Sequence, residues 1–377
     1  MKKDIILKVV KVIYLVCCLV VAFTPNILTD DSVYGEKAQT QITWIDTGNE
    51  SDEKRYDKQF KSLEQHELSK HEGLTSTIIS VDGKVIYEKY FNGNDESSTF
   101  EIHSCTKTII AILTGIAHDQ KMMGDEKSKY IDMFQGLDVP EVSDGFEDIT
   151  IEDMLSMSSG INWDKYSNLW STKISIIRNG LDYGRNTIPS AALAHRHGEH
   201  FNYNSNESRS LMAMVAYKSG MEDYEFAEKY LFNKLGIKDY LWPYNDSGLL
   251  PGGKDLFLSA RDMWKVGQLL LDKGVYEGQQ IISQEWIDKM LTPVKKDVPA
   301  EDILPVDRLD YGYYMWHTTY KDVDVNYAYG RGGQCIFLVP QYDICVVTSA
   351  IDKERNDSFR NIVYDVIDIY EGKYSYE

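Results

Sequence analysis

The chain has 377 residues, enough for one large domain or two ordinary ones, and carries a formal net charge of −19. Its apolar fraction of 43% and its 26 tyrosines can supply a large packed core, which argues against global disorder. The acidic balance, with no offsetting run of Lys and Arg, argues against nucleic acid as a partner.

The N-terminal segment departs from this composition. Four lysines lie within the first 11 residues, and an apolar run covers 12–23. A basic start and a short apolar run predict a secretory signal peptide, while further apolar residues at 5–10 leave an uncleaved membrane anchor open. We therefore assign 1–23 to a signal peptide or membrane anchor, 24–53 to a polar linker and 54–377 to one main domain. The protein is expected to be extracytoplasmic, either secreted or tethered to the cytoplasmic membrane by its N-terminal segment.

The first elements of the main domain follow in chain order. Apolar residues near helical spacing predict a short surface helix over 54–70. A hairpin covers 77–91, because Asp82-Gly83 supplies the positive backbone angles of a two-residue turn between β-branched residues. Residues 108–118 carry apolar side chains at helical spacing, which predicts a helix with one broad buried face.

The middle and the end of the chain differ in pattern. Residues 119–250 mix short helical stretches with Gly, Asn and Asp breaks and show no strand alternation. A helix over 260–273 follows, with Ser259 as its N-cap and Gly274 beyond its end.

Strands over 334–339 and 344–350 and a closing helix over 357–370 complete the chain. The predicted fold class is α+β: an antiparallel sheet flanked by helices from both chain ends, with an inserted, mostly helical lobe and a cleft between the two.

Three cysteines follow the N-terminal segment, and this sparse, odd set is not a disulfide framework. A turn at 340–343 would place Cys335 opposite about Thr348 and Cys345 on the other face of the sheet. Core packing is therefore the preferred interpretation for both.

The strongest chemical signal is Ser104 three residues before Lys107, at the start of the apolar helix. This spacing puts a hydroxyl and an amine on the same helical face, where a neutral lysine can activate the serine as a nucleophile. Only about one lysine in 2,500 is neutral at pH 7 at the ordinary pKa, so the site must lower that pKa. Ser51 and Lys54 share the spacing but lie in a polar stretch without an apolar helix.

Two further segments support a site. Tyr203 and Ser205 lie in the polar loop Phe201-Asn-Tyr-Asn-Ser205. Arg331-Gly332-Gly333-Gln334 leads into a strand, where glycines let a ligand approach the backbone and the arginine offers forked donors.

With these three elements in this order, the chain resembles the serine β-lactamase and penicillin-binding-protein superfamily over about residues 70–370. The similar branch is the group of class C β-lactamases, D-alanyl-D-alanine carboxypeptidases and 6-aminohexanoate-dimer hydrolases. Residues 149–160, 258–263 and 333–340 also resemble stretches typical of that group. The resemblance implies a β-lactamase/transpeptidase-like fold.

The resemblance also implies an acyl-enzyme mechanism. Lys107 and Tyr203 take the proton of Ser104, which attacks an ester or amide carbonyl, and Tyr203 returns a proton to the leaving group. The backbone N–H groups of Ser104 and Gln334 form the oxyanion hole. Ser205, together with the Arg331-Gly332-Gly333 turn, contacts the substrate, and Arg331 is expected to lower the pKa values of Lys107 and Tyr203.

Two positions depart from the group's pattern. Ser205 stands where the second element usually has Asn, and Arg331 where the third has Lys or His. Both departures argue against penicillin hydrolysis but leave acyl transfer intact. The expected substrate is a small-molecule or cell-wall-derived ester or amide. The alternative function is a non-catalytic protein of the same fold that binds cell-wall peptides.

Other residues carry weaker signals. His195, His197 and His200 suggest zinc, but no carboxylate or Cys partner follows by spacing, so a polar loop is preferred and no metal or cofactor is expected. His103 is assigned to packing rather than to base catalysis. The chain has no Gly-x-Ser-x-Gly element of an α/β-hydrolase. Three tryptophans could form an apolar acyl pocket: Trp163, Trp170 and Trp316.

Overall fold

The computed structural model describes residues 50–134, 144–163, 193–244, 250–301, 308–351 and 359–374. The predicted N-terminal signal peptide or anchor, most of the predicted linker, and Trp170 lie outside these ranges. Helix α2 (Glu50–His66) begins four residues inside the stretch assigned to the linker, and a 3₁₀ turn (Leu68–Lys70) follows it. Within the described ranges, none of the helices has the length and apolar character needed to cross a membrane.

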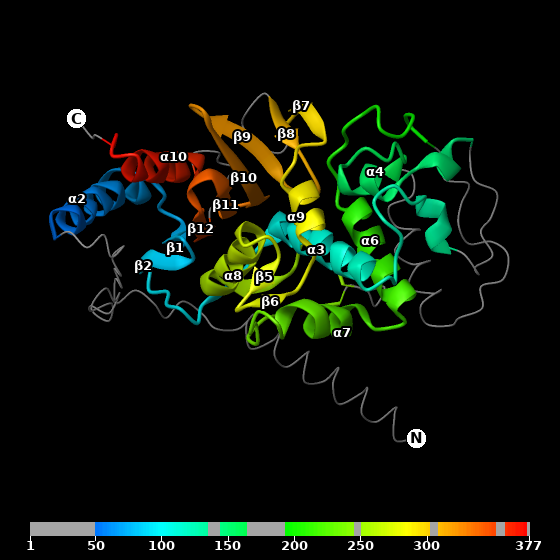
Figure 1. The fold of residues 1–377 in the computed structure, drawn as a ribbon, viewed down its shortest axis with the longest axis horizontal. Helices are drawn as coiled ribbons and strands as arrows, with labels where there is room; N and C mark the ends of the chain where they lie inside the picture. The colour runs from blue at the N-terminus through cyan, green and yellow to red at the C-terminus, as the bar shows by residue number, and fades with distance from the viewer. Residues whose placement is uncertain are drawn as a thin grey trace, which may run out of the picture. The chain divides into compact units, whose positions relative to one another are not determined.

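The centre of the fold is an antiparallel sheet of eight strands (Figure 1). Their order in space is β2-β1-β12-β11-β10-β9-β8-β7, so strands from the two chain ends meet where β1 pairs with β12. The strands are β1 (Leu74–Val81), β2 (Lys84–Tyr90), β7 (Lys295–Pro299), β8 (Arg308–Tyr311), β9 (Trp316–Tyr320), β10 (Val323–Gly330), β11 (Gln334–Val339) and β12 (Ile344–Ala350).

Both predicted hairpins are confirmed. Asp82 and Gly83 join β1 and β2 with φ of 49° and 70°, the positive angles that a two-residue turn needs. In the second hairpin Cys335 pairs with Thr348, as the turn at 340–343 predicts. Cys335 and Cys345 are buried free thiols.

The sequence pattern missed β7, β8, β9 and β10, which make up half of the main sheet. Three of them, β7, β8 and β9, carry only four or five residues, and β7 contains a register shift against β8. Such short strands lack the run of alternating residues that pattern reading requires.

Helices cover both faces of the sheet. Cys345 lies against Gly267 of α8 (Ala260–Leu271), while its neighbour Ile344 lines a small cavity with Val366 of α10 (Phe359–Tyr370). Because adjacent strand residues point to opposite faces, α8 and α10 lie on opposite sides of the sheet. Figure 1 shows α10 beside α2. The Ser259 hydroxyl accepts a hydrogen bond from the Asp262 N–H, which confirms the predicted N-cap of α8.

The predicted helical lobe is confirmed in the residues that are described. In the sequence it falls between β3 and β4, two short strands that pair with each other. Its helices α4 and α6 appear on the right of Figure 1. The remaining elements are β3 (Thr99–Glu101), α3 (Thr106–Asp119), α4 (Ile151–Leu155), α6 (Asn206–Ser219), α7 (Asp223–Ala227), β4 (Phe257–Ser259), β5 (Val275–Tyr276), β6 (Gln279–Gln280) and α9 (Gln284–Met290).

Candidate active site

Ser104 lies where the sequence predicts, directly before the apolar helix. It is in the middle of a 3₁₀ turn, His103–Cys105, and α3 begins at Thr106. The Ile102 N–H donates to the Leu256 carbonyl at 2.8 Å. The carbonyl of the same residue faces Gly330, the last residue of β10. A Cβ at Gly330 would meet the Ile102 carbonyl oxygen at 2.2 Å, so only glycine fits there. Backbone contacts therefore hold the turn that carries Ser104 between two segments distant in sequence.

Lys107 is the candidate base for Ser104. Its Nζ lies 3.0 Å from Ser104 Oγ and donates to the Gly253 carbonyl oxygen, also at 3.0 Å. The Lys107 side chain is 1% exposed, whereas Ser104 is only partly buried. A reachable hydroxyl thus contacts an amine that is shielded from water.

Burial lowers the pKa of Lys107 to about 7, and the positive charge of Arg209 acts in the same direction. Negative charge on Cys105 would oppose this shift, but burial keeps the pKa of that thiol well above its ordinary value. The sequence-based expectation that Arg331 lowers the Lys107 pKa is not supported, because burial and Arg209 account for the lowering. A large fraction of Lys107 is therefore neutral near pH 7.

Tyr203 borders the same pair. Lys107 Nζ lies 4.9 Å from the centre of the Tyr203 ring. That ring stacks on Trp316, with centroids 5.5 Å apart, and meets Tyr311 edge-on at 6.2 Å. The aromatic contacts fix the plane of the tyrosine beside the base, because stacked and edge-on rings have preferred geometries.

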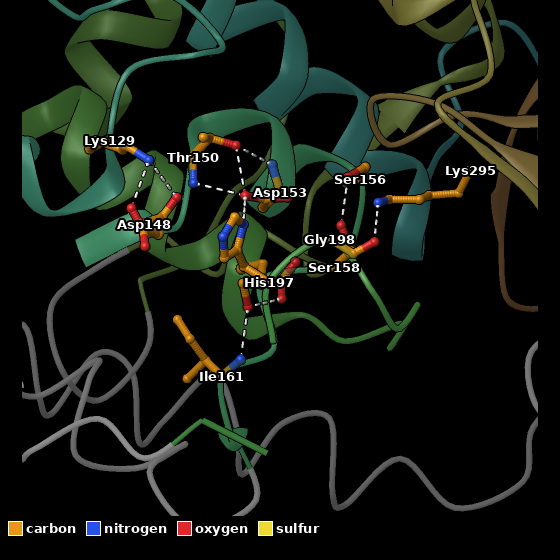
Figure 2. Close-up of polar contacts among 12 residues, drawn as sticks. Lys129, Asp148, Thr150, Asp153, Ser156, Ser158, Ile161, His197, Gly198 and Lys295 are labelled. Carbon is orange, nitrogen blue, oxygen red and sulfur yellow. Dashed lines mark hydrogen bonds and ion pairs between the residues drawn. The ribbon is translucent and has the colours of Figure 1, made fainter. Parts of the chain in front are cut away.

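The chain that leads to Tyr203 is fastened to the segment after α4. The Asn202 N–H donates to the Met157 carbonyl at 2.7 Å, and the Gly198 N–H donates to the Ser158 carbonyl at 2.7 Å. Figure 2 shows two side-chain contacts of this region: His197 Nδ1 lies 2.9 Å from an Asp153 carboxylate oxygen, and Lys295 donates to the Gly198 carbonyl at 2.8 Å.

Ser205 lies at the N-terminal end of α6, next to the Gly252-Gly253 turn. A Cβ at Gly253 would lie 2.5 Å from the Ser205 Cβ. The Gly253 carbonyl accepts the hydrogen bond from Lys107. A glycine is required because the turn must pass between Ser205 and the base.

Arg331, Gly332 and Gly333 form the turn between β10 and β11. Gly332 and Gly333 have φ of 88° and 93°, a backbone region that favours glycine. The Arg331 side chain is exposed. The Cys105 thiol donates to the Gln334 carbonyl at 3.3 Å, so the start of β11 lies beside the nucleophile turn. The structure thus brings Ser104 and Gln334 together, while the oxyanion-hole role of their N–H groups stays a prediction.

The tryptophans support the site from beneath rather than lining an open pocket. Trp316 is 2% exposed and packs under Tyr203. Trp163 is also 2% exposed, and its indole N–H donates to Glu207 at 3.2 Å. Their assignment to an acyl pocket therefore needs correction: both are buried.

The histidines have other partners. His195 and His200 rings pack against each other at 4.1 Å, while His197 contacts Asp153. Among the described residues, no group of three or more His, Cys, Asp or Glu side chains is arranged to hold a metal ion. His103 Nδ1 lies 3.0 Å from Glu101, so its partner is a carboxylate rather than the apolar core.

Sequence reasoning missed four residues around the site: Cys105, Glu207, Arg209 and Gly253. No motif marks them, since each acts through contacts with residues far away in the chain. A Cys within the Ser-x-x-Lys element and a Glu four residues after Tyr203 were visible, but neither carries meaning without the fold.

Comparison with known proteins agrees with this geometry. Residues 69–367 match the family described as Beta-lactamase. The 6-aminohexanoate-dimer hydrolase of Paenarthrobacter ureafaciens is 25% identical over 150 residues, which cover 39% of this chain and 38% of that protein. The match therefore spans well under half of the curated relative's length.

Solved structures share the fold. A penicillin-binding protein homologue from Caulobacter crescentus has a TM-score of 0.66 at 12% identity, covering 88% of this chain and 99% of that one. The octameric penicillin-binding protein homologue from Pyrococcus abyssi has a TM-score of 0.60 at 18% identity, covering 87% and 78%. These structures confirm the predicted fold class, and the family match over 69–367 confirms the predicted superfamily. By the match over 69–367, the chain belongs to the β-lactamase family.

Proposed function

We propose that this protein is an extracytoplasmic serine hydrolase that cleaves an ester or amide through an acyl-enzyme on Ser104. The observation that carries the proposal is the 3.0 Å contact between Ser104 Oγ and a buried Lys107 whose pKa is about 7. A base with a pKa near the working pH combines a usable neutral fraction with sufficient basicity. The basic and apolar N-terminal segment supports the location.

The reaction follows from these positions. Neutral Lys107 accepts the hydroxyl proton as Ser104 Oγ forms a bond to the substrate carbonyl carbon. The N–H groups of Ser104 and Gln334 stabilise the oxyanion. The bond to the leaving oxygen or nitrogen breaks as a proton, delivered through Tyr203, reaches it. Water then attacks the acyl-enzyme and releases the acid, which restores Ser104.

The substrate class is a small-molecule or cell-wall-derived ester or amide. An amide is consistent with the name of the Paenarthrobacter relative, a dimer hydrolase. Ser205 and the exposed Arg331 replace the Asn and Lys or His that the β-lactamase pattern carries, so we expect weak turnover of β-lactams.

A hydrolysis panel tests the proposal on the full chain. It comprises nitrocefin, short-chain nitrophenyl esters, D-alanyl esters, D-Ala-D-Ala peptides and a linear aminohexanoate dimer. We expect repeated turnover of at least one ester or amide and a fluorophosphonate adduct on Ser104 by peptide mass spectrometry. A folded Ser104→Ala variant that retained full activity would overturn the nucleophile. Acylation without turnover would favour the binding-protein alternative.

A further inference from the structure

Behind Tyr203, a carboxyl group lies buried in the helical lobe. Glu207 is the second residue of α6 and is 1% exposed. One of its oxygens accepts two hydrogen bonds, from Ser159 Oγ at 2.6 Å and from the Trp163 indole N–H at 3.2 Å. Among the described residues, no Lys, Arg or His pairs with it within 4.0 Å. Burying a carboxyl group without a cation costs free energy, so the contacts that it makes must compensate for that cost.

The two donors join α6 to the segment that anchors the Tyr203 loop. Ser159 Oγ also accepts the Ile161 N–H at 3.2 Å. In the same segment Met157 holds Asn202 through a 2.7 Å backbone hydrogen bond. Tyr203 is therefore fastened on both sides to residues 157–163: through Asn202 before it and through Glu207 after it.

The carboxyl group is held in its neutral form. Burial raises the pKa of Glu207 to about 8, although its hydrogen bonds act in the opposite direction. The other oxygen, Oε2, is buried without a hydrogen-bond partner in the described structure. The titratable groups that face Glu207 are Tyr130, Tyr311 and Tyr314, whose raised pKa values keep them neutral too. The surroundings thus contain hydrogen-bonding groups but no compensating charge.

We propose that Glu207 is a positioning residue of the active site: by accepting hydrogen bonds from Ser159 and Trp163, it fixes the first turn of α6 and so holds Tyr203 against Lys107. Glu207 does not touch the reacting atoms. It acts through Tyr203, so this inference rests on the proposed hydrolase function. An error of about 1 Å in the placement of a catalytic group can cost about 100-fold in rate.

Three variants separate geometry from charge. Glu207→Gln keeps a carbonyl oxygen that can accept both hydrogen bonds, whereas Glu207→Leu keeps the volume and removes the acceptor. Ser159→Ala removes one donor. With the best ester of the panel, we expect Glu207→Leu to lower kcat about 10-fold or more with little change in KM. Ser159→Ala should lower kcat less, and Glu207→Gln should stay within about 3-fold of the wild type.

The pH profile provides a readout that a purely structural role would not move. Wild-type kcat should fall above pH 8 as the buried carboxyl ionises, and this decline should be weaker in Glu207→Gln. Glu285→Gln, an exposed glutamate on α9, is the matched control and should leave the profile unchanged. Near-UV circular dichroism reports on folding, and if Glu207→Leu does not fold, Trp163→Phe removes the other donor instead.

Two results would overturn the inference. One is a wild-type kcat in both Glu207→Leu and Ser159→Ala when both variants are folded. The other is a decline of kcat above pH 8 that is identical in Glu207→Gln and the wild type. Failure of the proposed function is distinguishable, since it would appear as full activity in Ser104→Ala or as no turnover by the wild type itself.

Discussion

Lys107 Nζ donates a 3.0 Å hydrogen bond to the main-chain carbonyl of Gly253, a residue 146 positions away in the sequence. The carbonyl holds the amine in place while the same nitrogen remains 3.0 Å from Ser104 Oγ. A neutral amine has two N–H donors and one lone pair, so it can donate to Gly253 and accept the Ser104 proton. The proposed base is thus oriented by backbone rather than by a carboxylate, which would favour its charged form.

Substitution of Gly253 should disrupt this arrangement. In Gly253→Ala the new Cβ would lie 2.5 Å from the Ser205 Cβ, so the turn must shift and the carbonyl must move away from Lys107. We expect kcat/KM to fall about 10-fold or more, measured with the best ester of the panel. The double variant Gly253→Ala with Ser205→Gly removes the clashing atom and should recover part of the loss. No recovery relative to Ser205→Gly alone would contradict the steric explanation.

The pH dependence of activity should report on Lys107. If the neutral amine is the base, its pKa of about 7 predicts that kcat/KM rises with pH through about 7, before the decline above pH 8 expected from Glu207. Stopped-flow measurement of the acylation rate from pH 5 to 9 would follow this rise, which is the acid limb of the pH profile. A limb centred near the ordinary lysine pKa would show that burial does not neutralise the base.

Substitutions of Arg209 and Arg331 should affect the rise of kcat/KM near pH 7 differently. The positive charge of Arg209 contributes to the lowered pKa of Lys107. Arg209→Gln should therefore move the acid limb to higher pH, whereas Arg331→Gln should change KM and leave the limb in place. A shift with Arg331→Gln and none with Arg209→Gln would reverse the assignment.

Stability should depend on pH through Glu207. Its pKa is raised from an ordinary 4.5 to about 8, so between these values the folded protein keeps a proton that the unfolded chain has released. The stabilising contribution is complete below pH 4.5 and is lost as pH rises through 8, at up to about 1.4 kcal/mol per unit. Urea unfolding at several pH values should show a flatter dependence for Glu207→Gln. Parallel curves for the two proteins would refute this.

The capping box of α4 should contribute measurable stability. The Thr150 hydroxyl accepts the Asp153 N–H, and the Asp153 carboxylate accepts the Thr150 N–H in return. Thr150→Ala should lower the free energy of unfolding by about 1 kcal/mol, measured by urea denaturation. Thr319→Ala, at an exposed position on β9, should change it by less than about 0.5 kcal/mol.

Local features of the fold could be predicted from the sequence because they depend on neighbours in the chain. The Asp82-Gly83 turn, the N-cap at Ser259 and the pairing of Cys335 with Thr348 each follow from a few adjacent residues. The short strands β7, β8 and β9 could not be predicted, since short strands are stabilised mainly by pairing with partners in the sheet.

The candidate active site could likewise be predicted only in part from the sequence. The sequence by itself determined that Ser104 and Lys107 share a face, because helical spacing of three residues sets that geometry locally. Only the tertiary structure decided how Lys107 is placed and kept neutral: burial and Arg209 lower its pKa, and the carbonyl of Gly253 orients its amine, all through segments distant in the chain. Solvent exclusion and charge proximity are properties of packing, and packing brings together residues whose spacing in the sequence carries no signal.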